Sequence, residues 1–246
     1  FNTILNLIFK LNVRLADDVY TAYEEIKEQA TSVRTTAQPE PILFPNAVDP
    51  VTFEPADQTT SLDEIGLLEW RSAFVVGFVG SLRERHQVSQ LIAGAAQSDT
   101  NAHLLIVGDG PERAALEQQA KRLNIEKNVH FTGAINHDDV PTRISACDVC
   151  YGVVDPDRPS NPIKIYEYLS CERPVITSDT AELSFVSELN LGEAVETPTP
   201  QLVSEAIDRL ADRSESERAE IGASGREYIL EHHTWAQLAD SIVETL

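Results

Sequence analysis

From residue 74 onward the chain alternates short apolar segments with segments of helical periodicity, and this alternation restricts the possible fold more than any other feature. The segments that predict strands are 74–80 (FVVGFVG), 103–108 (HLLIVG), 129–133 (VHFTG), 147–154 (CDVCYGVV), 174–179 (PVITSD) and 192–197 (GEAVET). The segments that predict helices are 88–96, 111–123, 139–145, 162–171, 182–189 and 200–212. Such alternation is typical of an α/β, Rossmann-like fold, in which a parallel sheet carries helices on both faces.

The ligand crevice of such a fold lies beyond the carboxyl ends of the strands, which selects the loops that follow Gly80, Gly108, Gly133 and Val154. The loop after Gly80 reads SLRERHQ and lacks the G-x-G-x-x-G spacing of a dinucleotide site. It still brings three cationic groups together in a very acidic chain, and a diphosphate is the anion that they would suit. The alternative is that the two arginines only neutralise the charge of nearby acidic side chains and bind no ligand. The three groups are Arg83, Arg85 and His86.

A second candidate binding segment is residues 160–179, SNPIKIYEYLSCERPVITSD. Asn161 suits the N-cap of a helix and Pro162 suits its first position. The free amides of that first turn, together with Lys164, would attract an anion. Glu167 lies one turn further along the helix and could accept two hydrogen bonds from the vicinal diol of a ribose. The alternative is an ordinary Lys164–Glu167 surface ion pair.

The first 70 residues differ in character from the rest. Apolar residues recur with helical spacing at the start, a strand and a helix are expected within 16–30, and clustered prolines then mark a linker. The chain begins with Phe1 and contains no methionine, so we expect it to be the tail of a longer protein. We expect three regions: 1–45 as the end of a preceding domain, 46–70 as an interdomain linker and 71–246 as the main domain.

The net charge of -21 excludes some classes of partner. An acidic surface repels nucleic-acid backbones and anionic lipid headgroups, so we expect no nucleic-acid partner. So large an excess of acidic residues favours a halophilic source. Cys147 and Cys150 form a C-x-x-C, but positions three apart on a strand point to opposite faces, so we expect buried thiols rather than a metal or redox site.

The acidic excess predicts that folding depends on salt. Like charges on one surface repel each other in the folded state, and salt screens this repulsion by shortening the Debye length to about 3 Å at 1 M. We therefore expect the melting temperature to rise between about 0.1 and about 2 M potassium chloride. A scan in an uncharged osmolyte at matched osmolality is the control. A melting temperature that stays constant in potassium chloride would contradict a halophilic origin.

Several motifs in order resemble family-4 glycosyltransferases, which are retaining enzymes with the GT-B fold. The segment 162–176 is similar to the Pro-x-Lys-x-x-Glu-Tyr-x-Ala-x-Gly-x-Pro-Val-Ile run of this family, with Glu172 in place of the usual glycine. LLIVGDGPERAALEQQA and VHFTGAINHDDVPTRISACDVCYGV resemble the segments that precede it in the family. PNAVDPVTFEP resembles the interdomain linker, with Ala47 where glycine is usual.

The resemblance implies a donor site for a nucleotide diphosphate sugar of the UDP or GDP type, without a cofactor and without a divalent metal. Glu167 matches the glutamate that holds the ribose. The implied contacts to diphosphate, base and sugar come from the residues Gly80, Ser81, Arg83, His86, Gly133, Ala134, Ile135, Asn161, Pro162, Ile163 and Lys164. The sequence departs from the family at Pro159, where a first glutamate is usual, and at Ser81, where arginine is usual.

The resemblance further implies transfer of a sugar to a glycan or lipid-linked acceptor, as in polysaccharide biosynthesis. The catalytic residues on the acceptor side are expected in a domain of which 1–45 is only a remnant, so this fragment alone is expected to be inactive. A cytoplasmic location is expected, and peripheral association with the inner face of the membrane through the missing domain stays open. The alternatives are a non-catalytic nucleotide-sugar-binding scaffold and a nucleotide-sugar epimerase of the same fold.

Overall fold

The strands of the main sheet alternate their side chains between two apolar cores, which is the pattern expected of a sheet covered on both faces. The computed structural model describes residues 2–155 and 160–245, and the chain divides into two compact units. The first unit runs up to Asn46 and includes Asn161, and the second begins at Ala47. Each unit is described separately below.

In the second unit, the described residues form a six-stranded sheet in which every paired strand is parallel, in the order β5-β4-β3-β6-β7-β8. The strands are β3 (Val75–Val79), β4 (His103–Val107), β5 (Val129–Gly133), β6 (Val149–Tyr151), β7 (Val175–Ser178) and β8 (Gly192–Val195). The predicted α/β fold is confirmed, and each strand falls within a segment expected to be extended.

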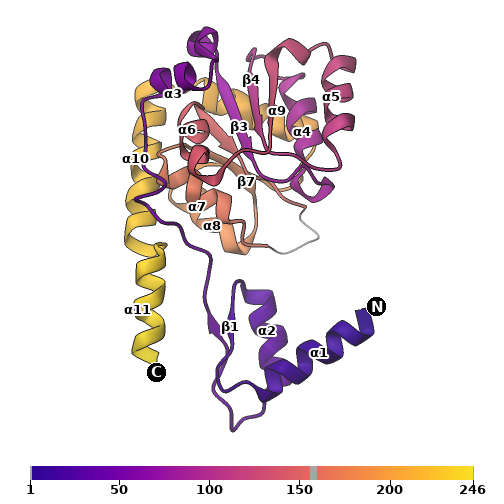
Figure 1. Ribbon diagram of the computed structural model, residues 1–246, viewed down its shortest axis with the longest axis vertical. Helices are drawn as coiled ribbons and strands as arrows, with labels where there is room; N and C mark the ends of the chain where they lie inside the picture. Colours follow the sequence, from indigo (N-terminus) through magenta and orange to yellow (C-terminus); the bar gives the residue numbers. More distant parts are fainter. Residues whose placement is uncertain (1, 156–159, 246) are drawn as a thin grey trace. The chain divides into compact units, whose positions relative to one another are not determined.

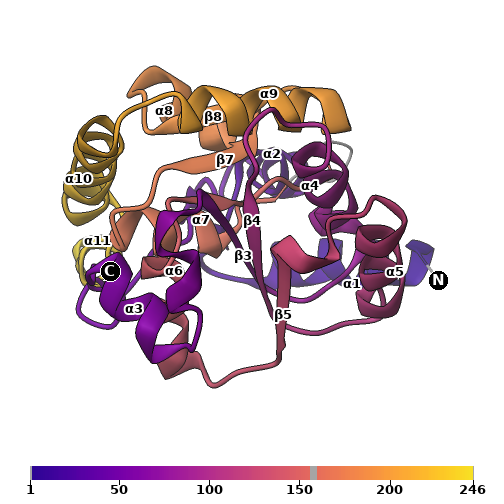
Figure 2. The same ribbon diagram turned by 90° about the horizontal axis from the view of Figure 1, so that it is seen from above.

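Helices cover both faces of this sheet (Figures 1 and 2). One face carries α4 (Val88–Ala95), α5 (Arg113–Arg122) and α9 (Pro200–Ala211), which pack on Val76, Leu104 and Ile106. The other face packs on Val75, Leu105 and Val107. It carries α3 (Gln58–Glu64), α6 (Val140–Ser145), α7 (Ile163–Ser170), α8 (Ser184–Glu188) and α10 (Glu215–His232). The chain continues into α11 (Trp235–Thr245).

Short 3-10 helices fill several connections of the second unit. They are η1 (Leu68–Ser72), η2 (Glu84–His86), η3 (Glu126–Asn128), η4 (His137–Asp139) and η5 (Ala181–Leu183). Two of them, η2 and η4, follow the carboxyl ends of β3 and β5 and so lie at the edge of the sheet where ligands bind in such folds.

The stretch 46–70 has more structure than a linker composition predicts. It contains α3 and the first residues of η1, and Leu62 and Trp70 are buried in the core of the second unit. The side chain of Gln58 donates to Asp148 (3.1 Å), and the Phe53 carbonyl accepts from Ser170 Oγ (2.7 Å). The seven residues of α3 include a single large apolar side chain, Leu62, so no helical spacing could reveal this helix in the sequence.

Cys147 and Cys150 do not point to opposite faces, so that part of the sequence interpretation is wrong. A Cβ atom added to Gly77 would lie 2.5 Å from Cys147 Sγ and 3.3 Å from Cys150 Sγ, so both thiols face the same point. The reason is that Cys147 lies in the turn after α6, before β6 begins at Val149, and the alternation of a strand does not yet apply. Both thiols are buried, as expected.

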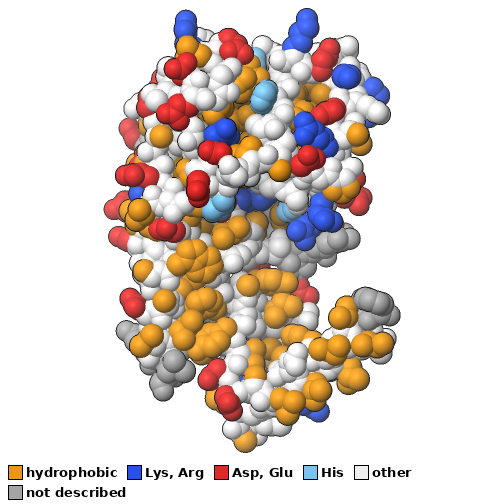
Figure 3. All heavy atoms as spheres, viewed as in Figure 1, with side chains coloured by type: hydrophobic (Ala, Val, Ile, Leu, Met, Phe, Trp, Pro, Cys, Tyr) orange, Lys and Arg blue, Asp and Glu red, His pale blue; other side chains and the backbone are white. Residues whose placement is uncertain are grey.

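The first unit consists of α1 (Asn2–Leu15), β1 (Tyr20–Thr21), α2 (Glu24–Val33) and β2 (Ile42–Leu43), and its two strands pair in parallel. Its core is small, formed by Val13, Ala30 and Val33. A row of large aliphatic side chains on α1 stays 50% to 74% exposed, and Figure 3 shows it as a band of orange. These side chains are Ile4, Leu5, Leu7, Ile8, Leu11 and Leu15. The helical stripe expected from the sequence is therefore present but largely uncovered.

Candidate functional site

Three glycines at the carboxyl ends of neighbouring strands bring the predicted loops together. Gly80 follows β3 with φ 145°, Gly108 follows β4 with φ 126°, and Gly133 ends β5. The amide of Gly80 donates to the Val107 carbonyl (2.9 Å), and the amide of Gly108 donates to the Gly133 carbonyl (3.0 Å). A Cβ atom on Gly108 would lie 2.0 Å from the Gly80 carbonyl oxygen, so only glycine fits between these loops.

The helix α7 is anchored beside this edge by a buried tyrosine. The hydroxyl of Tyr168 accepts a hydrogen bond from the Val79 amide (2.8 Å), at the end of β3. This bond fixes the register of α7 against the strand, so that Lys164 lies next to the turn at Gly80, with Glu167 one turn further along the helix. Both charged side chains are buried, with 7% and 8% of their surface exposed. They are therefore not the ordinary surface pair that the sequence left open.

The ammonium group of Lys164 faces Gly80 and the ring of Phe78. Its Nζ lies 4.0 Å from the Phe78 ring centroid and would lie 2.8 Å from a Cβ on Gly80. Among the described residues, this buried nitrogen has no hydrogen-bond partner. Burial lowers the pKa of Lys164 to about 7, although the Glu167 carboxylate acts in the opposite direction; the charge of Arg85 lowers it further.

Glu167 is flanked by cationic groups from two directions. Burial raises the pKa of its carboxyl group, whereas His137 and Lys164 act to lower it. His137 belongs to η4, and its ring packs edge-on against Phe53 at 5.4 Å between centroids. Sequence reasoning did not select His137, and its position directly after the Gly133–Ile135 loop was the signal that could have found it.

His86 is neutral near pH 7, contrary to the expectation that it supplies a third cation. Its Nε2 accepts a hydrogen bond from Arg85 Nε (3.3 Å), which requires a lone pair on that nitrogen. Burial, followed by the charges of Lys164, Arg85 and Arg83, lowers the pKa of His86 to about 4. The proton is therefore on Nδ1, which is buried and has no hydrogen-bond partner in the described part of the chain.

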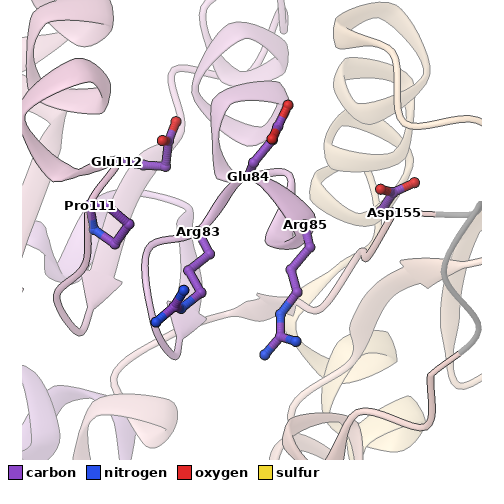
Figure 4. A pocket seen from close by; sticks show the side chains of 6 residues that line it. All are labelled: Arg83, Glu84, Arg85, Pro111, Glu112 and Asp155. Carbon is purple, nitrogen blue, oxygen red and sulfur yellow. The ribbon is translucent and has the colours of Figure 1, made fainter. Parts of the chain in front are cut away.

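A pocket of about 560 Å³ opens at the loop after β3, which carries Arg83 and Arg85. In Figure 4, Arg83 and Arg85 extend their guanidinium groups to the same side, whereas Glu84 and Glu112 point the other way. Its lining residues are Arg83, Glu84, Arg85, Pro111, Glu112 and Asp155. Because the amide of Asp155 donates to the Arg85 carbonyl (2.9 Å), the loops after β3 and β6 are joined at this point. The two strands are neighbours at the centre of the sheet, where its strand order reverses.

The other predicted residues take varied positions. Ser81 is exposed, and the pocket is not lined by Ala134 or Ile135, which follow Gly133 at the end of β5. Asn161 is not the N-cap of α7: Pro162 takes that place without a side-chain hydrogen bond, and Ile163 is the first helical residue. The amide side chain of Asn161 donates instead to the Ala22 carbonyl (3.3 Å) within the first unit. This long-range contact could not be read from the local sequence. Pro159 lies outside the described residues.

The described residues contain no group of three or more His, Cys, Asp and Glu side chains placed to hold a metal ion. Within the same residues, none of the helices combines the length and the apolarity that crossing a bilayer requires.

The chain is similar to several characterised transferases over part of their length. It is 34% identical over 113 residues to 2-deoxystreptamine glucosyltransferase of Streptomyces kanamyceticus, covering 44% of this chain and 29% of that protein. It is 26% identical over 211 residues to the GDP-mannose-dependent alpha-(1-6)-phosphatidylinositol dimannoside mannosyltransferase of Mycobacterium tuberculosis. This match covers 83% of this chain and 51% of that protein. The chain thus spans about half or less of the length of these relatives.

Solved structures share the fold at low sequence identity. Anabaena HepE, in complex with UDP and glucose, superposes with a TM-score of 0.84 at 21% identity, covering 100% of this chain and 67% of that one. The C-terminal domain of a Francisella tularensis group 1 glycosyl transferase (LpcC) gives a TM-score of 0.64 at 17% identity. This match covers 76% of this chain and 99% of that domain. These are GT-B glycosyltransferase neighbours, and the likeness concerns the fold.

The family comparison covers the part of the chain that builds the site. Residues 69–228 match the family described as glycosyl transferases group 1. This match includes the turn at Gly80, the pocket and the whole of α7, and it extends over more than half of the sequence. The chain therefore belongs to the group 1 glycosyl transferases.

Proposed function

We propose that the second unit binds a nucleotide diphosphate sugar and that the chain is part of a retaining, family-4 glycosyltransferase. The observation that carries this proposal is the buried pair on α7, Lys164 and Glu167, placed against the turn at Gly80. A buried ammonium with no hydrogen-bond partner in the described part of the chain, beside a buried carboxylate, suits a ligand that presents a phosphate next to a diol. A nucleotide sugar has this chemistry.

Each group has a proposed role. The diphosphate lies against Gly80, Ser81, Arg83, His86 and Lys164, and Glu167 accepts hydrogen bonds from the ribose hydroxyls. The base lies by Gly133, Ala134 and Ile135, and the sugar by the backbone of 161–163. As the glycosidic bond breaks, negative charge develops on the departing diphosphate, and fixed cations and helix amides stabilise it. The proposed chemistry therefore relies on the protein's own positive groups.

The relatives support this proposal. One is named as GDP-mannose-dependent, and HepE was crystallised with UDP-glucose as well as with UDP. We accordingly propose a donor of the UDP or GDP type and a saccharide or lipid-linked acceptor. We propose that residues 1–45 are the end of an acceptor-side domain, that 46–70 connect it and that 71–246 are the donor side. The site of action would be cytoplasmic.

Donor binding without transfer is the expected behaviour of this chain by itself. Calorimetric titration with UDP-glucose and GDP-mannose should detect binding, because the residues proposed for the donor side lie within this chain. Transfer should be absent, because holding the acceptor hydroxyl near the anomeric carbon contributes about 7–11 kcal/mol to lowering the barrier and needs the acceptor side. The measurement is radiolabelled sugar transfer to a panel of lipid and saccharide acceptors.

Three outcomes separate the candidate functions. Transfer at roughly 1 per second or faster would contradict the proposal that this chain is incomplete. Conversion of one nucleotide sugar to another without an acceptor would indicate an epimerase. Failure to bind any nucleotide sugar would overturn the donor site itself.

A further inference from the structure

We propose that the buried nitrogens of His86 and Lys164, beside Gly80, bind a phosphate group together with a proton, so that nucleotide-sugar binding takes up a proton from the solvent at pH 8. This inference rests on the proposed donor function and adds to it a property of the site: ligand affinity that is controlled by the protonation of one buried amine.

The cluster of His86 and Lys164 suits a ligand rich in acceptors. Two buried nitrogens, Lys164 Nζ and His86 Nδ1, have no hydrogen-bond partner among the described residues. The His86 ring is 6.0 Å from the Phe78 ring, and the Lys164 ammonium lies over the same ring at 4.0 Å, so Phe78 supports both groups. The missing side chain of Gly80 makes room for Nζ, because a Cβ there would lie 2.8 Å from it. The cluster thus presents two donors, and a phosphate can accept from both.

Burial and the charged groups around Lys164 decide its protonation in the absence of a ligand. Burial lowers the pKa of Lys164 to about 7; Glu167, on the same helix, favours the ammonium form, whereas Arg85 on η2 disfavours it. Burial, and after it the charges of Lys164, Arg85 and Arg83, also lowers the pKa of His86, whose Nε2 accepts from Arg85. Above neutral pH the site without ligand therefore holds mainly the neutral amine of Lys164.

Four further groups face this cluster and are part of the same balance. Arg83 acts on His86 in the same direction as Arg85. His137 faces Glu167 from η4, and Glu84 and Asp155 line the adjoining pocket together with Arg83 and Arg85. None of them removes the two unpartnered donors, so the strongest new interaction available to Lys164 is with a bound anion.

A bound diphosphate changes this balance by adding negative charge next to Nζ. The lone pair of the neutral amine takes a proton from the solvent, and the ammonium then donates to a phosphate oxygen. The buffer supplies the proton, and His86 Nδ1–H donates to the ligand without changing its own charge. With a pKa of about 7, the empty site is about nine-tenths neutral at pH 8, so binding should take up about 0.9 proton.

The experiment is calorimetry of UDP-glucose binding to the whole chain at pH 6, 7, 8 and 8.5, in pairs of buffers with different ionisation enthalpies. UDP-glucose is the suitable probe because its diphosphate has no group that titrates in this range. Affinity should fall about 30-fold between pH 6 and pH 8.5, and proton uptake should rise from about 0.1 toward 1.

Variants identify the group responsible. Lys164→Met should give weak binding without pH dependence, and Lys164→Arg should bind without pH dependence because arginine stays charged. Lys121→Met, at an exposed lysine on α5, is the matched control and should leave the profile unchanged. Glu167→Gln should keep the uptake and move it to lower pH, since Glu167 favours the charged form of Lys164.

The outcomes that overturn the inference are distinct. Binding at pH 8 with uptake near zero, or a pH profile that survives Lys164→Met, would overturn it and leave the donor site intact. If Glu167→Gln loses the proton uptake and Lys164→Met keeps it, the proton binds to Glu167. That result would also overturn the inference. Absence of any binding would overturn the proposed function and this inference together.

Discussion

Replacing Glu167 by alanine is expected to weaken binding of a nucleoside diphosphate by about 10- to 150-fold, equivalent to about 1.5–3 kcal/mol for hydrogen bonds to a charged acceptor. The carboxylate is buried and is flanked by His137 and Lys164 rather than held by a hydrogen bond from its own helix. It is therefore free to accept from a diol. The measurement is calorimetric titration with UDP at pH 7.

A second effect of Glu167→Ala separates a binding role from a structural one. Glu167 raises the pKa of Lys164, so its removal should lower that pKa and move the decline of affinity to lower pH. Glu220→Ala, at an exposed glutamate on α10, is the matched control and should bind like the parent. Unchanged affinity in Glu167→Ala, with a lowered melting temperature, would make Glu167 a structural partner of Lys164.

Gly108→Ala is expected to lower the free energy of unfolding by roughly 2–5 kcal/mol, because the new methyl group meets backbone rather than a movable side chain. The Cβ would lie 2.0 Å from the Gly80 carbonyl oxygen, and φ at this position is 126°. For a chain of this size the expected drop in melting temperature is about 4–20 °C. Donor binding should weaken as well, since the displaced turn carries Gly80.

Gly66→Ala provides the control for Gly108→Ala. Gly66 also has a positive φ, 75°, but a Cβ there would have no atom within 4 Å. Only the backbone penalty of about 1–2 kcal/mol should remain. Differential scanning calorimetry of both variants would test the close approach of the loops, and equal melting temperatures would show that it is not needed for stability.

Sequence patterns were sufficient to predict the strands of the large sheet, because these strands are buried on both faces. A segment such as 103–108 reads as a continuous apolar run, and its boundaries agree with β4 to within one residue. The sequence also predicted that the loop after Gly80 and the helix of Lys164 belong to one edge of the sheet, and the structure places Gly80 beside Lys164. They meet because the carboxyl ends of parallel strands share one edge of a sheet. The roles of these residues stay predictions.

The remaining features depend on contacts between distant parts of the chain. Asn161 has the composition of a helix cap, but its side chain bonds Ala22, which lies 139 residues away. His86 becomes a neutral donor because burial, and after it the charges of Lys164 and the arginines, lowers its pKa in the folded chain. Local propensity contains no information about either neighbour, so these parts of the prediction were wrong.

A contact between the start of the second unit and the start of α11 suggests how the sheet can be handled as an engineering module. The amide of Val48 donates to the His233 carbonyl (2.9 Å), and the amide of Trp235 donates to the Val48 carbonyl (3.2 Å). Val48 and Trp235, which enclose all six strands of the large sheet along the chain, are therefore side by side, and this arrangement tolerates domain insertion and circular permutation. A segment cut at 47 and 235 could be grafted into a surface loop of another scaffold, which would then carry the sheet, the turn at Gly80 and α7 as a single cassette.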